Sequence, residues 1–241
     1  KQAAALANAD LGLLSPERRD AIVAACEEIR AGKLHDQFVV DQIQGGAGTS
    51  TNMNANEVIA NRGLELMGHE KGDYAHLSPI DDVNRSQSTN DVYPTAIKLA
   101  MVFGIQRLLA EHKLLTAAFA AKGREFANIL KIGRTQLQDA VPMTLGQEFE
   151  SWRTNIYHEI ERLRAGSDML LEVNLGGTAI GTGINTPEGY PTIVTKKLAE
   201  VTGLDIRPSY DLVESSYDNG AYIAVHSIVK RLAAKLSKIC N

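Results

Sequence analysis

Two polar connections lead directly into the N-termini of long predicted helices. Ser88-Thr89-Asn90-Asp91 precedes a helix that starts around Val92, and Thr135-Gln136-Leu137-Gln138-Asp139 precedes one that we expect to open at Pro142. Free backbone N–H groups and the positive end of the helix dipole gather at such ends and attract anions. Hydroxyl and amide side chains add directed donors without a formal charge. These connections therefore predict a site for a carboxylate ligand.

A simpler interpretation stays open for the first connection. Ser88, Thr89 and Asn90 belong to the residue types that most often cap a helix, and capping is compatible with ligand binding. The glycine-rich run Gly45 to Ser50 resembles a phosphate-binding loop, but no Gly-Lys-Ser/Thr follows it and no apolar strand precedes it. A structural turn explains it equally well.

The sequence contains no motif typical of a metal site or of a catalytic triad. None of the six histidines has a second histidine four residues away with a nearby glutamate, and no serine or cysteine sits in a nucleophile-elbow motif. Asp81-Asp82 is typical of a solvated loop end or a helix cap. We therefore expect no metal site and no hydrolysis by a catalytic triad.

Long apolar stripes predict the elements that hold these connections. Spacings of three and four residues repeat from Leu145 to Leu163 and again from Ala221 to Ile239, which indicates two amphipathic helices of about five turns each. A third helix is expected from about Asp91 towards Leu115. Alternating β-branched residues are scarce, so the predicted class is all-α, a bundle of long helices.

Shorter helices are expected nearer the N-terminus. Ser15-Pro16 predicts a cap followed by proline at the first helical position, and Asn54 to Met67 is a second candidate helix. We expect residues 1–85 to form a smaller helical domain and residues 86–241 part of a bundle domain. The chain begins with Lys1 and ends in helical register at Asn241, so we expect a fragment cut inside helices at both ends.

Composition narrows the class of protein. The 241 residues carry a net charge of −4 without runs of lysine or arginine, which argues against nucleic acid as a partner. No apolar run approaches the roughly 18 residues that span a bilayer, so no membrane partner is expected. Cys26 and Cys240 lack any metal-binding spacing. They suggest reduced thiols and a cytoplasmic location.

Three of the polar segments resemble the fumarase/aspartase superfamily. They are Gly45 to Glu57, Gln87 to Asp91 and Gly133 to Ala140, and the resemblance extends nearly from end to end of the chain. Within the superfamily, three segments look like the aspartases: Leu66 to Gly72, Gly133 to Phe149 and Glu172 to Pro187. The resemblance implies elimination of ammonia from L-aspartate to give fumarate, without an organic cofactor, by a homotetramer whose active sites combine segments of three chains.

The resemblance also implies site residues. Hydroxyl and amide side chains would contact the substrate, namely Thr49, Ser88, Thr89, Asn90, Thr135 and Gln136, with Asn90 and Gln136 ranked after the other four. Arg134 is expected to fix its loop by an ion pair, and Gln138 and Asp139 are expected to cap a helix. Thr178, Thr182 and Asn185 are expected only to order a glycine-rich turn.

Two features of the superfamily are absent from this chain. The general base is a serine in a Gly-Ser-Ser-x-x-Met-Pro-x-Lys-x-Asn loop, which we expect beyond Asn241, so the 241 residues alone should bind substrate weakly and not turn it over. The second dicarboxylate site of class II fumarases begins with histidine where this chain has Ser78, and its asparagine matches Ile80. No such second site is expected.

Two alternatives to an aspartase remain. A class II fumarase would usually carry histidine at the position of Gln136, although some aspartases do so as well. A non-catalytic scaffold, as among the lens crystallins derived from this superfamily, is disfavoured by the intact threonine and serine positions.

Overall fold

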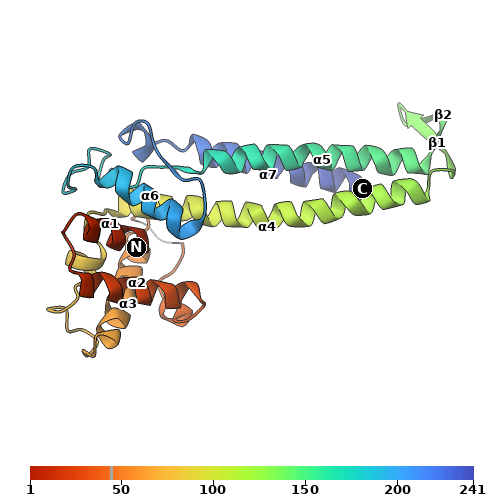
Figure 1. The fold of residues 1–241 in the computed structure, drawn as a ribbon. Helices are drawn as coiled ribbons and strands as arrows, with labels where there is room; N and C mark the ends of the chain where they lie inside the picture. The colour runs from red at the N-terminus through yellow and green to blue at the C-terminus, as the bar shows by residue number, and fades with distance from the viewer. Residues whose placement is uncertain (44–45) are drawn as a thin grey trace. The chain divides into compact units, whose positions relative to one another are not determined.

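The computed structural model describes residues 1–43 and 46–241. Helices dominate it, which confirms the all-α class (Figure 1). The longer helices are α1 (Gln2–Asp10), α2 (Pro16–Arg30), α3 (Thr49–Leu66), α4 (Thr89–Glu125), α5 (Leu145–Met169), α6 (Tyr190–Thr202) and α7 (Gly220–Cys240). The remaining elements are η1 (His35–Gln37), η2 (Pro79–Val83), η3 (Glu214–Ser216) and the strands β1 (Leu130–Thr135), β2 (Gln138–Thr144), β3 (Glu172–Val173) and β4 (Arg207–Pro208).

The chain divides into two compact units, one made of residues 1–99 and 171–218 and the other of residues 100–170 and 219–241. This division differs from the predicted boundary between residues 85 and 86. Segment 171–218 joins the N-terminal unit because its apolar residues share a core with α1, in which Val173, Tyr190 and Val194 pack with Ala4 and Ala7. Helix α4 contributes residues to both units.

The N-terminal unit contains a second core between α2 and α3. Its fully buried side chains include Ile22, Leu64 and Leu77. Helix α2 begins as predicted, with Pro16 as its first residue and the Ser15 hydroxyl accepting from the backbone N–H of Arg18 at 3.4 Å. Helix α3 begins at Thr49, five residues before the predicted start.

The second unit contains the two helices that the long stripes predicted, α5 and α7. Ile156, Ile160 and Leu163 of the first stripe are buried, as are Val225 and Leu232 of the second. Aromatic side chains join α4 to α5, since the ring of Phe119 lies 6.0 to 6.2 Å from those of Trp152 and Phe149. Helix α4 also extends ten residues beyond the expected Leu115.

The prediction of a helix opening at Pro142 was wrong. Residues 130–144 form an antiparallel hairpin of β1 and β2, in which Pro142 pairs with Ile132. Helix α5 starts three residues later at Leu145, where Thr144 and Gln147 form a reciprocal capping box. The capping box decides the boundary because both side chains bond the free N–H groups of the first turn, whereas proline supplies only a compatible φ angle.

Candidate functional site

A hollow of about 550 Å³ in the N-terminal unit is bordered by the start of α4. Ser88 and Thr89, two of the predicted substrate-binding residues, line it. Most of the other lining side chains that bear polar groups are amides or hydroxyls, with one acid and one base: Asn52, Asn84, Ser86, Gln87, Thr178, Asn185, Asp81 and Arg85. This composition suits a small polar ligand with carboxylate groups.

Ser88 and Thr89 are held at the helix N-terminus by their neighbours. The Ser88 hydroxyl accepts from the backbone N–H of Asn90 at 3.2 Å, which is the capping role expected of it. The Thr89 hydroxyl accepts from the side-chain amide of Asn52 at 3.0 Å. Because both oxygens act as acceptors in these contacts, each hydroxyl keeps its own hydrogen for donation to an anion.

A buried carboxylate, Asp91, fixes the backbone beside these hydroxyls. Its Oδ1 accepts from the N–H of Ser88 at 2.9 Å, and its Oδ2 accepts from the N–H groups of Gly176 and Thr178, each at 3.0 Å. Burial raises the pKa of Asp91, and the backbone donors only partly oppose that shift. Asp91 therefore ties the start of α4 to the glycine-rich turn after β3.

Asn90 takes part in the same junction. Its side-chain amide donates to the carbonyl oxygen of Ala179 at 2.8 Å, and its own carbonyl oxygen accepts from Asn174 at 3.1 Å. Asn90 is not among the residues that line the hollow. Its contact with substrate stays a prediction, whereas its part in bracing the two loops is a feature of the structure.

Asn84 is a further organising residue, which the sequence reasoning missed. Its Oδ1 accepts from Lys1 at 2.8 Å and from the amides of Asn52 and Asn56 at 3.2 Å each. Its own amide donates to the carbonyl oxygen of Gln87 at 3.2 Å. The detectable signal was the pair Asn52 and Asn56, which lie four apart and therefore on one face of α3.

Thr49 begins α3 and is exposed. Its hydroxyl donates to the carbonyl oxygen of Gly46 at 2.9 Å, and Thr49 is not among the residues that line the hollow. It precedes the lining residue Asn52 by one helical turn. Gly45, the first residue of the matching motif, lies outside the described residues.

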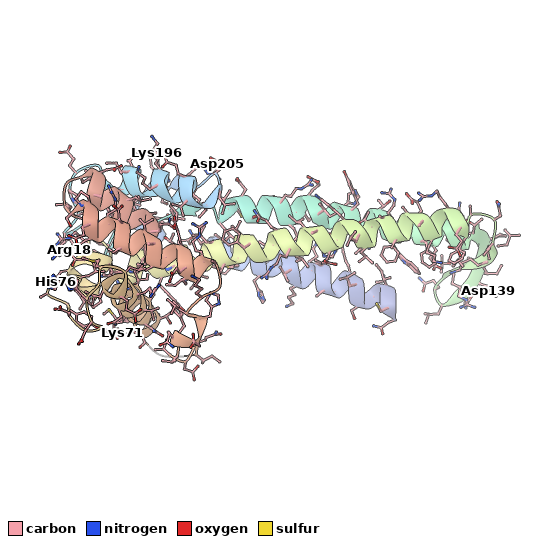
Figure 2. The ribbon with its side chains drawn as sticks, turned by 60° about the horizontal axis from the view of Figure 1, so that its bottom comes forward. Arg18, Lys71, His76, Asp139, Lys196 and Asp205 are labelled. Carbon is pink, nitrogen blue, oxygen red and sulfur yellow. The ribbon has the colours of Figure 1, made fainter. Side chains whose placement is uncertain are left out.

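Thr135 and Gln136 belong to the other compact unit, where they form the end of β1 and the turn to β2. Gln136 (φ 52°) and Leu137 (φ 60°) are both left-handed, as a two-residue hairpin turn requires. Both predicted site residues are exposed, and the Leu137 side chain is fully exposed. The labelled Asp139 in Figure 2 marks this hairpin.

The supporting residues of the hairpin differ partly from expectation. Arg134 forms the predicted ion pair, with its Nε 3.0 Å from Oδ1 of Asp139. The prediction that Gln138 and Asp139 cap a helix was wrong, because both lie in β2 and Thr144 is the cap. Thr178 and Asn185 do more than order a turn, since both line the hollow.

Known proteins with similar sequences were compared with the chain. The profile of a protein family described as "Lyase" matches residues 1–241. The chain belongs to this lyase family. An aspartate ammonia-lyase of Pseudomonas aeruginosa is 57% identical over 242 residues, which cover 100% of this chain and 51% of the relative. The chain thus spans about half the length of the curated relatives it matches.

Solved structures support the fold. A fumarate lyase:delta crystallin from Brucella melitensis bound to cobalt has a TM-score of 0.97 and 53% identity, over 99% of this chain and 52% of the other. A class II fumarase from Schistosoma mansoni has a TM-score of 0.92 and 30% identity, over 99% of this chain and 53% of the other. Among the described residues of this lyase-family chain, no helix has the length and apolarity to cross a membrane.

Proposed function

We propose that the protein containing this chain eliminates ammonia from L-aspartate to give fumarate. The hollow lined by Ser88 and Thr89 at the start of α4 is the observation that carries the proposal. The relative of 57% identity named aspartate ammonia-lyase supports the same reaction. The chemistry needed is carboxylate recognition by donors that bring little formal charge.

The difficult step is removal of a proton from C3 of aspartate. The electron pair of that C–H bond moves into the neighbouring carboxylate and creates a doubly charged aci-carboxylate; it then returns to form the double bond as the C–N bond breaks and ammonia leaves. Preorganised donors aimed at the developing charge lower such a barrier by several kcal/mol. The hydroxyls of Ser88 and Thr89, which lie at the positive end of the α4 dipole, are suited to this role.

We propose that the rest of the site is completed by other subunits and by a segment beyond Asn241. Thr135 and Gln136 would reach the substrate from another subunit of a homotetramer. Thr49 and Asn90 would also contact the substrate. The general-base serine would lie beyond Asn241. The isolated 241 residues would then bind substrate weakly and lack turnover, so lyase activity from this segment alone would contradict the assignment.

A class II fumarase is the second candidate because it shares the fold at a TM-score of 0.92. Identity to that fumarase is 30%, against 57% for the aspartate ammonia-lyase, and Gln136 stands where such fumarases usually have histidine. Aspartate is therefore the favoured substrate. We propose no organic cofactor and, because both thiols are free, a cytoplasmic location.

The test is fumarate production by the full-length protein, followed by ultraviolet absorbance, from L-aspartate and separately from L-malate. Activity on aspartate is expected. Activity on malate alone would assign the protein to the fumarases, and inactivity on both substrates would favour a non-catalytic scaffold.

A further inference from the structure

Three metal-ligating side chains, none of which lines the hollow, converge in the segment between α3 and η2. Oδ2 of Asp73 lies 3.8 Å from Nδ1 of His69 and 3.6 Å from Nε2 of His76. All three potential ligand atoms lie within 4.8 Å of one another. The side chains are 31%, 42% and 50% exposed for His69, Asp73 and His76, so an ion can reach them from solvent.

We propose that His69, Asp73 and His76 bind a divalent transition-metal ion of the zinc type. Two imidazole nitrogens and one carboxylate oxygen suit Zn²⁺ and its neighbours in the first transition row. Mg²⁺ and Ca²⁺ prefer sites built from oxygen atoms. Three protein ligands leave a fourth tetrahedral position for water.

The distances are close to those of a formed site. Ligand atoms about 2.0 to 2.1 Å from a tetrahedral zinc ion stand roughly 3.3 to 3.4 Å apart. The two measured N···O distances exceed this by only a few tenths of an ångström. Small side-chain movements therefore bring the carboxylate and the rings into range.

One ring must also turn. The imidazoles of His69 and His76 stack with centroids 3.8 Å apart and planes 12° apart, whereas a ring nitrogen binds a metal in the plane of its own ring. Rotation of His76 about its side-chain bonds lets both nitrogens face one ion. Its exposure provides the space for that rotation.

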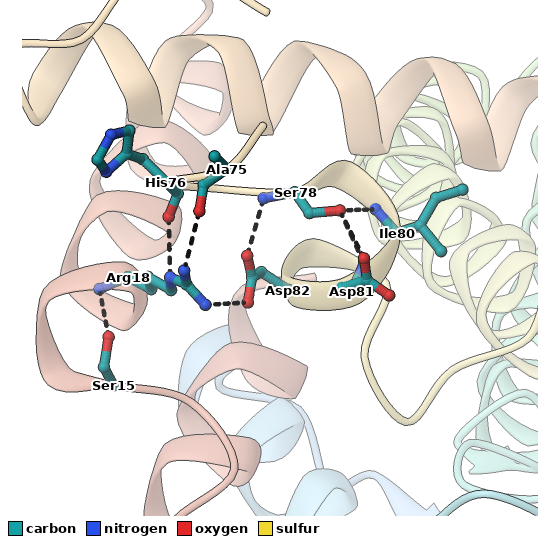
Figure 3. A network of polar contacts seen from close by, with 8 residues as sticks. All are labelled: Ser15, Arg18, Ala75, His76, Ser78, Ile80, Asp81 and Asp82. Atoms are coloured by element: carbon teal, nitrogen blue, oxygen red, sulfur yellow. Dashed lines mark hydrogen bonds and ion pairs between the residues drawn. The ribbon is translucent and has the colours of Figure 1, made fainter. Parts of the chain in front are cut away.

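The backbone that carries the ligands is firmly held. Arg18 donates from Nε to the carbonyl oxygen of His76 at 2.8 Å and from its terminal nitrogen to that of Ala75 at 3.3 Å. Figure 3 shows these bonds, with the imidazole of His76 on the side of the backbone away from Arg18. At the other end of the segment, the N–H of Gly72 donates to Asn61 at 2.8 Å. A braced loop lowers the entropy cost of ordering ligands around an ion.

Nearby cations oppose binding little because they have anionic partners. Arg18 pairs with Asp82 at 3.1 Å, and Lys71 pairs with Glu65 at 3.2 Å. This proposal departs from the expectation that the chain has no metal site. That expectation rested on histidines four residues apart, whereas here Asp73 stands between two histidines separated by seven residues.

The experiment is calorimetric titration of ZnCl₂ into the chelator-treated full-length protein, with MgCl₂ in a parallel run. One Zn²⁺ per chain is expected, bound more tightly than Mg²⁺. His76→Gln and Asp73→Asn should each weaken Zn²⁺ binding at least tenfold, since even loss of a group that only orients a ligand costs roughly 10- to 100-fold. The matched control His158→Gln, an exposed histidine elsewhere, should leave the affinity unchanged.

A second measurement guards against misfolded variants. Without metal, both ligand variants should unfold at the parent's temperature, and Zn²⁺ should raise the Tm of the parent and of His158→Gln but not of the ligand variants. Absence of Zn²⁺ binding, equal affinity for Mg²⁺, or unchanged Zn²⁺ affinity in both ligand variants would overturn the proposal. The readouts do not depend on lyase activity.

Discussion

The start of α4 and the hairpin turn both carry proposed substrate-binding residues, yet they are built in opposite ways. At the start of α4, the buried carboxylate of Asp91 binds three backbone N–H groups and joins two loops. At the hairpin turn, Thr135 and Gln136 are exposed, and the supporting pair of Arg134 and Asp139 leaves each side chain 72% exposed.

The two regions would contribute to the proposed site in different ways. The first region is preorganised by contacts within the chain, so its side chains are fixed before substrate binds. The second lies on a two-residue turn whose Leu137 side chain is fully exposed. In the proposed homotetramer, another subunit would complete its contacts. The two regions should therefore respond very differently to substitution.

The largest effect is expected from Asp91→Ala. The change leaves three backbone N–H groups without their acceptor and should lower the free energy of unfolding by about 3 kcal/mol. Urea unfolding of the full-length protein measures this, with the exposed Asp205→Ala as the control in the same unit. A loss below about 1 kcal/mol would show that the α4 junction is not held by Asp91.

Thr89→Val tests catalysis at the same region with little change of shape. Loss of the hydroxyl donor should lower kcat for L-aspartate by roughly 100-fold, as for removal of one donor to a developing anion. Stability should change by less than about 1 kcal/mol, because Asn52 also donates to Asn84. The control variant Thr192→Val, which changes an exposed threonine of α6, should retain the parental kcat. If Thr89→Val also retained the parental kcat, Thr89 would have no part in the proposed reaction.

A substitution of Glu159 tests the stability of the unit that contains the hairpin. It is fully buried and pairs with Arg162, Arg231 and Lys235. Burial raises the pKa of Glu159, but the hydrogen bonds from Lys235 and Arg231 outweigh it, so the net shift is downward. Glu159→Gln should cost about 2 kcal/mol near pH 7.

The sign of that shift fixes the pH dependence. A carboxyl whose pKa is lower in the folded protein stabilises it fully above the unfolded value, about 4.3, and loses this effect as the pH falls through the folded value. The difference between the parent and Glu159→Gln should therefore be constant near neutrality and shrink in acid. Glu161→Gln, an exposed neighbour on α5, is the control, and a difference that grows in acid would contradict the assignment.

The smallest effect is expected from Asp139→Ala in the hairpin. Its ion pair with Arg134 is highly exposed, and such pairs contribute less than about 1 kcal/mol. Thermal unfolding with and without 1 M salt should show little difference from the parent. A loss of stability as large as that of Asp91→Ala would contradict the difference proposed between the two regions.

Local signals in the sequence predicted much of the fold. The stripes in α5 and α7 and the Ser15-Pro16 start of α2 were sufficient because spacing and capping are properties of neighbouring residues. The hairpin was missed because its strands are largely exposed, so that burial alternates over only the first four residues of β1 and not along β2. Because of Pro142, the helix start was predicted three residues too early, before the capping box at Thr144.

Only part of the proposed site could be predicted from local signals in the sequence. The expected helix start indicated a carboxylate site at the connection that contains Ser88 and Thr89, and the resemblance to the fumarase/aspartase superfamily implied that these two residues contact substrate. The support from Asp91, Gly176 and Thr178 joins residues more than 80 positions apart, and no local pattern encodes such a contact. The same holds for the segment 171–218, whose place with the N-terminal unit depends on a shared core.

Complementation between two inactive variants tests most directly whether the two regions serve one site built from different subunits. Ser88→Ala and Thr135→Val should each be nearly inactive on L-aspartate as full-length proteins. Co-expressed in equal amounts, they should assemble at random and recover about a quarter of the parental activity, because one site in four then takes both regions from unaltered positions. Activity no greater than that of the separate variants would contradict the account.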